Sequence, residues 1–241
     1  MKKLVLVSFA LMLAINVQAQ FWGNKKIKGN GEMTSITRTT SDYDGIKCAG
    51  SFNFILVSGT EGNIKIEGEL NLLEYIITEV KNNNLIVKVD NNVSLQSSRN
   101  KTITITIPFK DISEISLAGS GDLWSKSDIN SDDLKVSLAG SGDVKLTIDA
   151  QNTIAKVAGS GDLTLTGNTE NLEVRVAGSG DFHGFNLNAR HTDVSVAGSG
   201  DAKVVSNESL LARVAGSGDI KYKGNPTKED TKVAGSGSIS N

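Results

Sequence analysis

Six aspartates recur at nearly equal intervals in the second half of this 241-residue chain. Each directly follows an Ala-Gly-Ser-Gly tetrapeptide, and a seventh copy of the tetrapeptide is followed by Ser238. Carboxylates repeated in this way can bind calcium, as in Asp-containing β-roll repeats, or can accept hydrogen bonds from the backbone of a glycine-rich turn. The six residues are Asp122, Asp143, Asp162, Asp181, Asp201 and Asp219.

The form of the repeat favours a structural role for these carboxylates. A calcium-binding β-roll has metal turns at both ends of each coil and a residue between Gly and Asp, whereas this chain has one motif per repeat and Asp directly after Gly. We therefore expect each carboxylate to cap N–H groups of its own turn. Carboxylates about 4.8 Å apart repel by roughly 1 kcal/mol in water. Cations just before the corners would help to offset this: Lys156, Arg175, Arg213 and Lys232. We assign no metal; the candidates for a cation ladder are Asp143, Asp162, Asp181 and Asp201.

The remaining residues do not indicate enzymatic chemistry. The only two histidines, His183 and His191, fall at positions expected to face outward or to lie in loops. A row of identical aspartates offers no pair of different environments that would separate an acid from a base. The serine of Ala-Gly-Ser-Gly occurs seven times, although a catalytic nucleophile is needed only once. We predict a non-enzyme without a cofactor; a secreted calcium-binding or carbohydrate-active β-helix is the alternative.

The repeat that carries these residues has a nearly constant period. Successive tetrapeptides begin 21, 19, 19, 20, 18 and 19 residues apart. Before each corner, apolar residues alternate with polar ones, as at Leu172, Val174 and Val176, which is the period of a half-buried strand. Glycine tolerates positive φ and close backbone approach, so each Gly-Ser-Gly predicts a corner between two strands. The tetrapeptides begin at Ala118, Ala139, Ala158, Ala177, Ala197, Ala215 and Ala234.

Stacking of these units predicts the fold class. One strand–corner–strand unit cannot bury its inner face alone, whereas units stacked about 4.8 Å apart share hydrogen bonds and one continuous core. The prediction is an all-β chain that forms a right-handed parallel β-helix, or β-solenoid, with about 19 residues per coil. A leucine-rich repeat would need its Leu-x-x-Leu-x-Leu frame and a β-propeller about 40 residues per blade; neither pattern is present. The expected corner glycines are Gly119, Gly121, Gly140, Gly142, Gly159, Gly161, Gly178, Gly180, Gly198, Gly200, Gly216 and Gly218.

The N-terminal half lacks the strict repeat but keeps the alternation typical of strands. Residues 75–80 and 85–89 predict a hairpin, and residues 70–74 predict one helical turn. The segment Cys48-Ala-Gly-Ser51 resembles the later corners, so it predicts a degenerate first coil with Cys48 in the buried slot of Val or Leu. We expect a single solenoid domain over residues 43–241, with hairpin decorations in its N-terminal half and strict repeats from about residue 115. Residues 20–42 are expected to form a flexible leader.

Residues 1–19 have the pattern of a secretory signal peptide: Lys2 and Lys3, a short apolar run, and small residues before Gln20. Loss of the two lysines would change the net charge from −2 to −4, and no basic patch suggests nucleic acid as a partner. We expect an exported protein in the periplasm, at the cell surface or outside the cell, with no transmembrane segment after cleavage. Its expected partner is an unidentified glycan or protein surface. The C-terminal coil around Ala234 to Asn241 is expected to allow weak self-association through its strand edge.

Several segments together resemble a known family. They are residues 46–55 (Ile-Lys-Cys-Ala-Gly-Ser-Phe-Asn-Phe-Ile), residues 69–73 (Glu-Leu-Asn-Leu-Leu), residues 104–115 around Pro108, and the Gly-Ser-Gly-Asp corners. Over about residues 43–223 the chain is similar to the putative auto-transporter adhesin, head GIN domain family, which is common in Bacteroidetes. The resemblance implies a β-solenoid, export and an adhesin-like role, and it supplies no catalytic residue. Nothing in the chain resembles a translocator barrel or an adhesin stalk, so literal auto-transport is not expected.

Overall fold

The computed structural model describes residues 24–241 and is almost entirely β-structure, with 68% strand and 2% helix. The first half contains β1 (Lys25–Lys28), β2 (Met33–Thr39), β3 (Gly45–Gly50), β4 (Asn53–Ser58), β5 (Asn63–Glu69), α2 (Leu70–Leu73), β6 (Ile76–Lys81), β7 (Asn84–Val89), β8 (Val93–Gln96) and β9 (Thr104–Phe109). The second half contains β10 (Glu114–Gly119), β11 (Asp122–Ser125), β12 (Ile129–Gly140), β13 (Val144–Gly159), β14 (Leu163–Gly178), β15 (Phe182–Gly198), β16 (Ala202–Val205), β17 (Ser209–Gly216), β18 (Ile220–Lys223), β19 (Lys228–Gly235) and β20 (Ile239–Ser240). The signal-peptide prediction for residues 1–19 lies outside the described residues.

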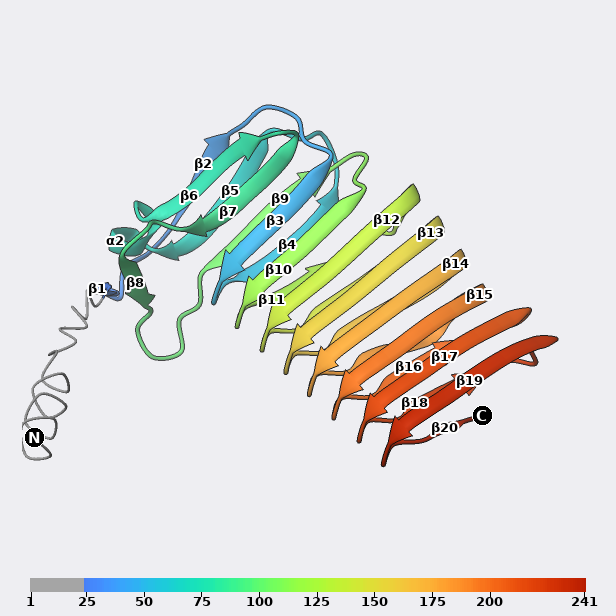
Figure 1. Cartoon of the computed structure of the whole chain (residues 1–241). Helices are drawn as coiled ribbons and strands as arrows, with labels where there is room; N and C mark the ends of the chain where they lie inside the picture. The colour runs from blue at the N-terminus through green and yellow to red at the C-terminus, as the bar shows by residue number, and fades with distance from the viewer. Residues whose placement is uncertain (1–23) are drawn as a thin grey trace, which may run out of the picture.

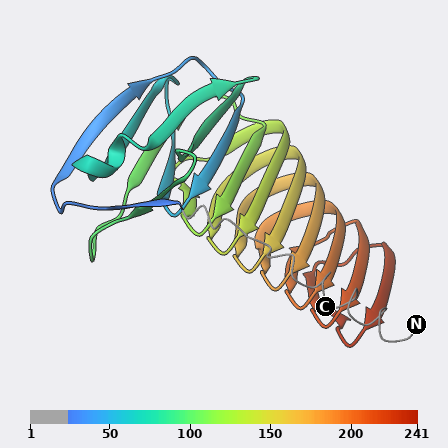
Figure 2. The ribbon, with the colours of Figure 1, turned by 60° about the vertical axis from the view of Figure 1, so that its left-hand side comes forward.

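The second half is a row of parallel coils stacked along one axis (Figures 1 and 2). Neighbouring coils pair in register, so that Val157 lies beside Val176 and Gly159 beside Gly178. The predicted β-solenoid is confirmed, with about seven turns that are roughly 19 residues apart. Between β14 and β15 the register shifts near Thr164 and Thr166, which accommodates the one extra residue of the 20-residue repeat as a bulge.

Each coil has two strand segments, joined at one end by the Gly-Ser-Gly corner and at the other by a bend. In β14, Leu163 and Leu165 point inward before the bend, and Leu172 and Val174 point inward after it. The inward positions change from odd to even numbers between Thr169 and Leu172, so the chain turns there without leaving the strand ladder. We call this second turning point the bend.

The two glycines of each corner are required for different reasons. Gly159 has a φ of +131°, in the region that side chains rarely adopt. Gly161 needs no positive φ, but a Cβ there would lie 2.0 Å from the carbonyl oxygen of Gly142 in the preceding coil. Successive corners therefore nest backbone against backbone, which leaves no room for any side chain at the second glycine.

Columns of apolar side chains, one for each inward position of the coil, fill the inside of the stack. The residues immediately before the first six corners are at most 3% exposed, whereas Val233, before the last corner, is 42% exposed. The six buried residues are Leu117, Leu138, Val157, Val176, Val196 and Val214. Full burial of a Val or Leu side chain contributes about 1.5–3 kcal/mol. Because the unit repeats, the core grows with each added coil.

The N-terminal half joins the stack as its first coil and adds antiparallel strands to it. β3 pairs with β10 so that Cys48 lies beside Leu117, and β4 pairs with β11. The predicted degenerate coil is present, and burial raises the pKa of the Cys48 thiol well above its usual range. The hairpin of β6 and β7 and the single turn of α2 also lie where the sequence predicts them.

The prediction of a flexible leader over residues 20–42 is wrong for most of that segment. β1 pairs with β8, and β2 pairs along its whole length with β5. Strand alternation in Met33–Thr39, with Ile36 packed on the core, is the signal that this expectation overlooked. Residues 20–23 lie outside the described residues.

Candidate functional site

The corner aspartates form the predicted ladder, but their carboxylates do not cap their own turns. Oδ1 of Asp143 accepts a hydrogen bond from the backbone N–H of Asp162 in the next coil, at 3.2 Å. The same bond links every consecutive pair, with distances of 2.8–3.2 Å. The last bonds join Asp219 to the backbone N–H and hydroxyl of Ser238 at 2.7 and 2.9 Å.

The N–H groups within each turn have other acceptors, which corrects the expected capping. The amides of Ser160 and Gly161 both donate to the carbonyl oxygen of Gly140 in the preceding coil, at 2.8 and 3.1 Å. Nesting of the corners brings this carbonyl within hydrogen-bond distance of both amides. The ladder is therefore a connection between coils, in which each aspartate holds the coil that follows it.

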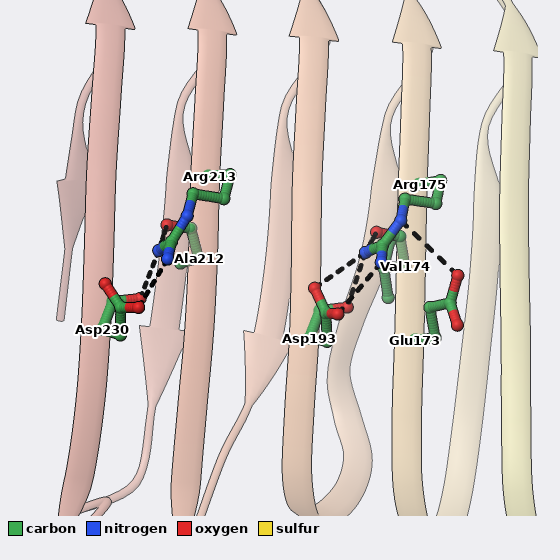
Figure 3. A network of polar contacts seen from close by, with 7 residues as sticks. All are labelled: Glu173, Val174, Arg175, Asp193, Ala212, Arg213 and Asp230. Atoms are coloured by element: carbon green, nitrogen blue, oxygen red, sulfur yellow. Dashed lines mark hydrogen bonds and ion pairs between the residues drawn. The ribbon is translucent and has the colours of Figure 1, made fainter.

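Two of the basic residues expected to neutralise the ladder, Arg175 and Arg213, pair with other acidic residues instead. Arg175 makes a two-pronged ion pair with Asp193, at 2.8 and 3.0 Å, and also contacts Glu173 (Figure 3). Arg213 contacts Asp230 across the next pair of coils (Figure 3), with one nitrogen donating to a carboxylate oxygen and the other to the backbone carbonyl oxygen of Asp230. Hydrogen bonding to Asp193 raises the pKa of Arg175. These pairs connect adjacent coils on the outside of the sheet that precedes the corners.

Beside the ladder itself lies one of the two histidines. Nε2 of His183 is 3.5 Å from Oδ2 of Asp162. Donor atoms of Asp162, Asp181 and His183 all lie within 4.8 Å of one another. Of the four aspartates named as cation candidates, Asp162 and Asp181 thus gain a third potential ligand. His191 lies elsewhere, with Nδ1 2.8 Å from the Ser209 hydroxyl.

A large hollow runs along the bends on the other side of the coils. It is a groove of about 970 Å³ that crosses four successive coils, β12 to β15, and the loop before β10. We call it the bend groove. The carboxylates of Asp44, Asp111, Asp132, Asp149 and Glu170 line it, together with the amides of Asn130, Gln151, Asn168 and Asn188 and the guanidinium of Arg190.

Regular columns of polar groups build the walls of the bend groove. Asn130, Asp149, Asn168 and Asn188 lie beside one another in the strand ladder. The column continues to Asn207, whose amide donates to Asn188 at 2.8 Å. Such groups can donate to and accept from a ligand at intervals of one coil, about 4.8 Å.

A second groove of about 520 Å³ lies just beyond the bend and is less polar. Ile154, Leu210 and Leu211 contribute to its lining, and charged residues such as Glu173 and Asp193 flank them. The two grooves follow the same edge of the stack on either side of the bend.

Sequence reasoning did not single out the groove residues. Their signal was present, because Asp149, Asn168 and Asn207 each follow the alanine of the preceding corner by ten residues and Asn188 follows it by eleven. A polar residue that recurs with the coil period marks a surface column. The corner motif is identical in every repeat, whereas this position changes between Asn and Asp and shifts by one residue in one repeat, which makes its period harder to recognise.

The described residues include no helix that is long and apolar enough to cross a membrane. The family model of the putative auto-transporter adhesin, head GIN domain, matches residues 42–226. The chain belongs to this family, as its segments predicted. No curated protein matches the chain at a significant level.

Solved structures of similar proteins share the fold. A putative adhesin from Bacteroides fragilis is 26% identical, covers 89% of this chain and 99% of its own, and superposes with a TM-score of 0.82. A protein described as a putative lipid binding protein, from Parabacteroides distasonis, is 28% identical over 90% of this chain and 99% of its own, with a TM-score of 0.73. A putative adhesin from the same organism is 22% identical over 90% and 99%, with a TM-score of 0.72, and supports the fold alone.

Proposed function

We propose that this protein is an exported, non-enzymatic binding module of the adhesin type, whose ligand lies along the bend groove. The groove itself is the observation that carries the proposal. It is long, it follows the axis of the stack, and it is lined by polar columns that repeat with each coil. An extended chain can bind there through many similar hydrogen bonds, which suits attachment better than turnover. Family membership supports the same role.

The chemistry of the groove lining supports a binding role over catalysis. It contains carboxylates, amides and hydroxyls, but no histidine, cysteine or lysine among its described lining residues. Asp132 and Asp149 occupy similar exposed positions, whereas acid–base catalysis needs two groups in different environments. The regular polar wall therefore fits recognition of a chain rather than reaction at one point.

Charge restricts the class of ligand. Five carboxylates line the bend groove and face a single guanidinium, that of Arg190. That guanidinium is already engaged by Glu208 at 2.7 Å and Glu170 at 3.6 Å. An acidic polysaccharide would be repelled along most of the groove. The proposed ligand is a neutral glycan or a neutral to basic protein segment at a surface.

A second candidate function is the binding of a lipid in the less polar groove. Its apolar lining by Ile154, Leu210 and Leu211 favours this function, and one similar structure is described as a putative lipid binding protein. The acidic residues around that groove would disfavour anionic lipid headgroups. Neutral phospholipid vesicles are the probe that distinguishes this candidate from the first.

A binding screen with matched charge variants tests the proposal. The protein is applied to a glycan array, to extracellular matrix proteins, to basic peptides and to neutral vesicles, with and without calcium. Asp149→Lys inside the bend groove should reduce binding to the best glycan or protein ligand at least about tenfold, equal to 1.4 kcal/mol. Asp128→Lys, an exposed residue outside the groove, should leave binding unchanged.

Three outcomes would overturn the proposal. Equal effects of Asp149→Lys and Asp128→Lys would place the ligand elsewhere on the molecule. Cleavage of a bound glycan, detected by released reducing ends, would assign the protein to the carbohydrate-active alternative. Binding to vesicles alone, insensitive to Asp149→Lys, would favour the second groove and the lipid candidate.

A further inference from the structure

The column next to the aspartate ladder is not uniform: three of its six residues are lysine, and the other three all differ. The position two residues after each ladder aspartate faces outward on the same sheet, and these positions lie beside one another in the strand register. Only one of them can ligate a transition metal through an imidazole. The residues along the column are Trp124, Lys145, Thr164, His183, Lys203 and Lys221.

His183 therefore singles out one step of an otherwise uniform ladder. Its Nε2 approaches Oδ2 of Asp162 at 3.5 Å, and Asp181 brings a second carboxylate oxygen into the same group. All three side chains are partly exposed, so an ion and its remaining water ligands can reach them. At the equivalent position in the neighbouring coils a lysine, a tryptophan or a threonine stands beside the ladder.

The two carboxylates are already oriented by bonds that a metal would not have to break. Oδ1 of Asp162 accepts from the backbone N–H of Asp181 at 3.2 Å, and Oδ1 of Asp181 accepts from that of Asp201 at 2.8 Å. The other oxygen of each carboxylate remains free of backbone donors. Hydrogen bonds of this kind hold metal ligands in place and increase the affinity of a site.

We propose that Asp162, Asp181 and His183 form a binding site for a divalent transition metal of the zinc class. Zinc binds imidazole nitrogen and carboxylate oxygen at about 2.0–2.2 Å in tetrahedral geometry, which places neighbouring ligand atoms a little over 3 Å apart. The 3.5 Å between His183 and Asp162 is close to that separation. Calcium instead requires six to eight oxygen ligands, and this site supplies a nitrogen and two carboxylates. The fourth position would be open to water or to a group from a partner.

An ion pair is the competing role for His183, since a protonated imidazole would offset the repulsion between the carboxylates. Lysine fills that role at the same position in three other coils, at Lys145, Lys203 and Lys221. His183→Lys is therefore a matched variant: it keeps a positive charge that the fold accepts elsewhere and removes the metal ligand. A metal site predicts that zinc binding is lost in His183→Lys, whereas a simple ion pair predicts that this substitution leaves zinc binding as it is in the parent.

Calorimetric titration with Zn²⁺ tests the site on protein purified without a histidine tag. The parent should bind one Zn²⁺ per chain, and His183→Lys should weaken binding at least about tenfold. Loss of a residue that only supports a metal ligand costs about 10–100-fold in affinity, so loss of a ligand itself should cost no less. His191→Lys, which alters the other histidine, should leave binding unchanged. Millimolar Ca²⁺ should not displace the zinc.

A transfer experiment makes the proposal independent of any loss of folding. In the His183→Lys background, Thr164→His places an imidazole beside Asp143 and Asp162, one coil earlier in the same register, and should restore binding of one Zn²⁺. Circular dichroism confirms that each variant is folded. The proposal is overturned if His183→Lys binds zinc like the parent, if His191→Lys abolishes binding, or if Thr164→His restores nothing.

Discussion

The N-terminal region (residues 24–113) and the stacked coils (residues 114–241) are held together in different ways. The coils use the same few contacts again and again: nested corners, a buried Leu or Val, and one aspartate bond per step. The N-terminal region depends on contacts that each occur once. The difference decides which substitutions are tolerated and which parts of the structure can be predicted.

Buried Glu69 shows how the N-terminal region is connected. Its carboxylate accepts hydrogen bonds from the backbone N–H of Gly31 at 2.6 Å and from the backbone and hydroxyl of Ser98 at 2.7 and 2.6 Å. A Cβ at Gly29 would overlap this carboxylate, at 2.1 Å. Three segments that are far apart in sequence thus meet at one side chain. The corner bonds of the coils, by contrast, have an equivalent at every step.

Arg38 and Tyr43 connect the same region in a similar manner. The Arg38 guanidinium donates to the carbonyl oxygens of Leu73, at 2.7 Å, and Ile76. The Tyr43 hydroxyl donates to the carbonyl oxygen of Pro108, and burial raises the pKa of that hydroxyl well above its usual range. These side chains fasten α2, β6 and β9 without any repeated motif.

The corner glycines provide the largest expected effect. Gly161→Val would place a branched side chain where even a Cβ lies 2.0 Å from a carbonyl oxygen of the preceding coil. The backbone of two coils would have to separate, so we expect the free energy of unfolding to fall by more than about 4 kcal/mol. Denaturant titration measures the loss.

Gly59→Val is the matched control, because a Cβ at Gly59 meets only Pro108 at 3.8 Å. That substitution should change stability by less than about 1 kcal/mol. Similar losses for Gly59→Val and Gly161→Val would show that the corner contacts are not the tightest part of the coils.

Glu69→Gln should have an intermediate effect that depends on pH. Desolvation raises the pKa of Glu69. The hydrogen bonds from Ser98 and Gly31 and the charge of Lys101 lower it by a larger amount, so the net pKa lies below the ordinary value. The ionised carboxylate therefore stabilises the fold above the pKa of about 4.3 of an unfolded glutamate, and this contribution is lost as pH falls through the lower folded value. At pH 7 we expect Glu69→Gln to cost about 1–3 kcal/mol.

Urea titrations at pH 7 and at about pH 3, well below the ordinary glutamate value, check this prediction. The difference between Glu69→Gln and the parent should shrink at the lower pH. A difference that is independent of pH would mean that the shape of the side chain, rather than its charge, connects the three segments.

The aspartate ladder should give the smallest effect of the three per substitution. Asp201→Ala removes the acceptor of the Asp219 N–H, a bond of 2.8 Å, and should cost about 1–2 kcal/mol. Asp201→Asn keeps an oxygen in place and should cost less. Chemical denaturation of both variants, with Asp149→Ala at the bend as a nearly neutral control, measures the contribution. An equal cost for Asp149→Ala would contradict a special role for the ladder.

The same contrast explains what could be predicted from the sequence. The period of the tetrapeptides and the alternation around Val174 were sufficient for the solenoid, its register and its buried column, because every repeat supplies the same signal. Glu69 carries no such signal, since its partners Gly31 and Ser98 are 38 and 29 residues away. The ladder residues were predicted, but their acceptor role was assigned to the wrong coil because sequence cannot show how closely two corners nest. Weak self-association through the edge of β19 stays a prediction.

The hydrogen bonds at the corners give the stack a direction. In each step the Ser, Gly and Asp amides of the later coil donate to oxygen atoms of the earlier one, as Ser160, Gly161 and Asp162 do. In the first corner the acceptors are Gly50 and Phe52 of the N-terminal region. A chain that emerges N-terminus first can therefore fold as a growing polymer, in which each completed coil is the template for the next. Removal of coils from the C-terminal end leaves the corner amides of the remaining coils paired. Loss of the N-terminal region would instead leave the amides of Ser120, Gly121 and Asp122 without their acceptors.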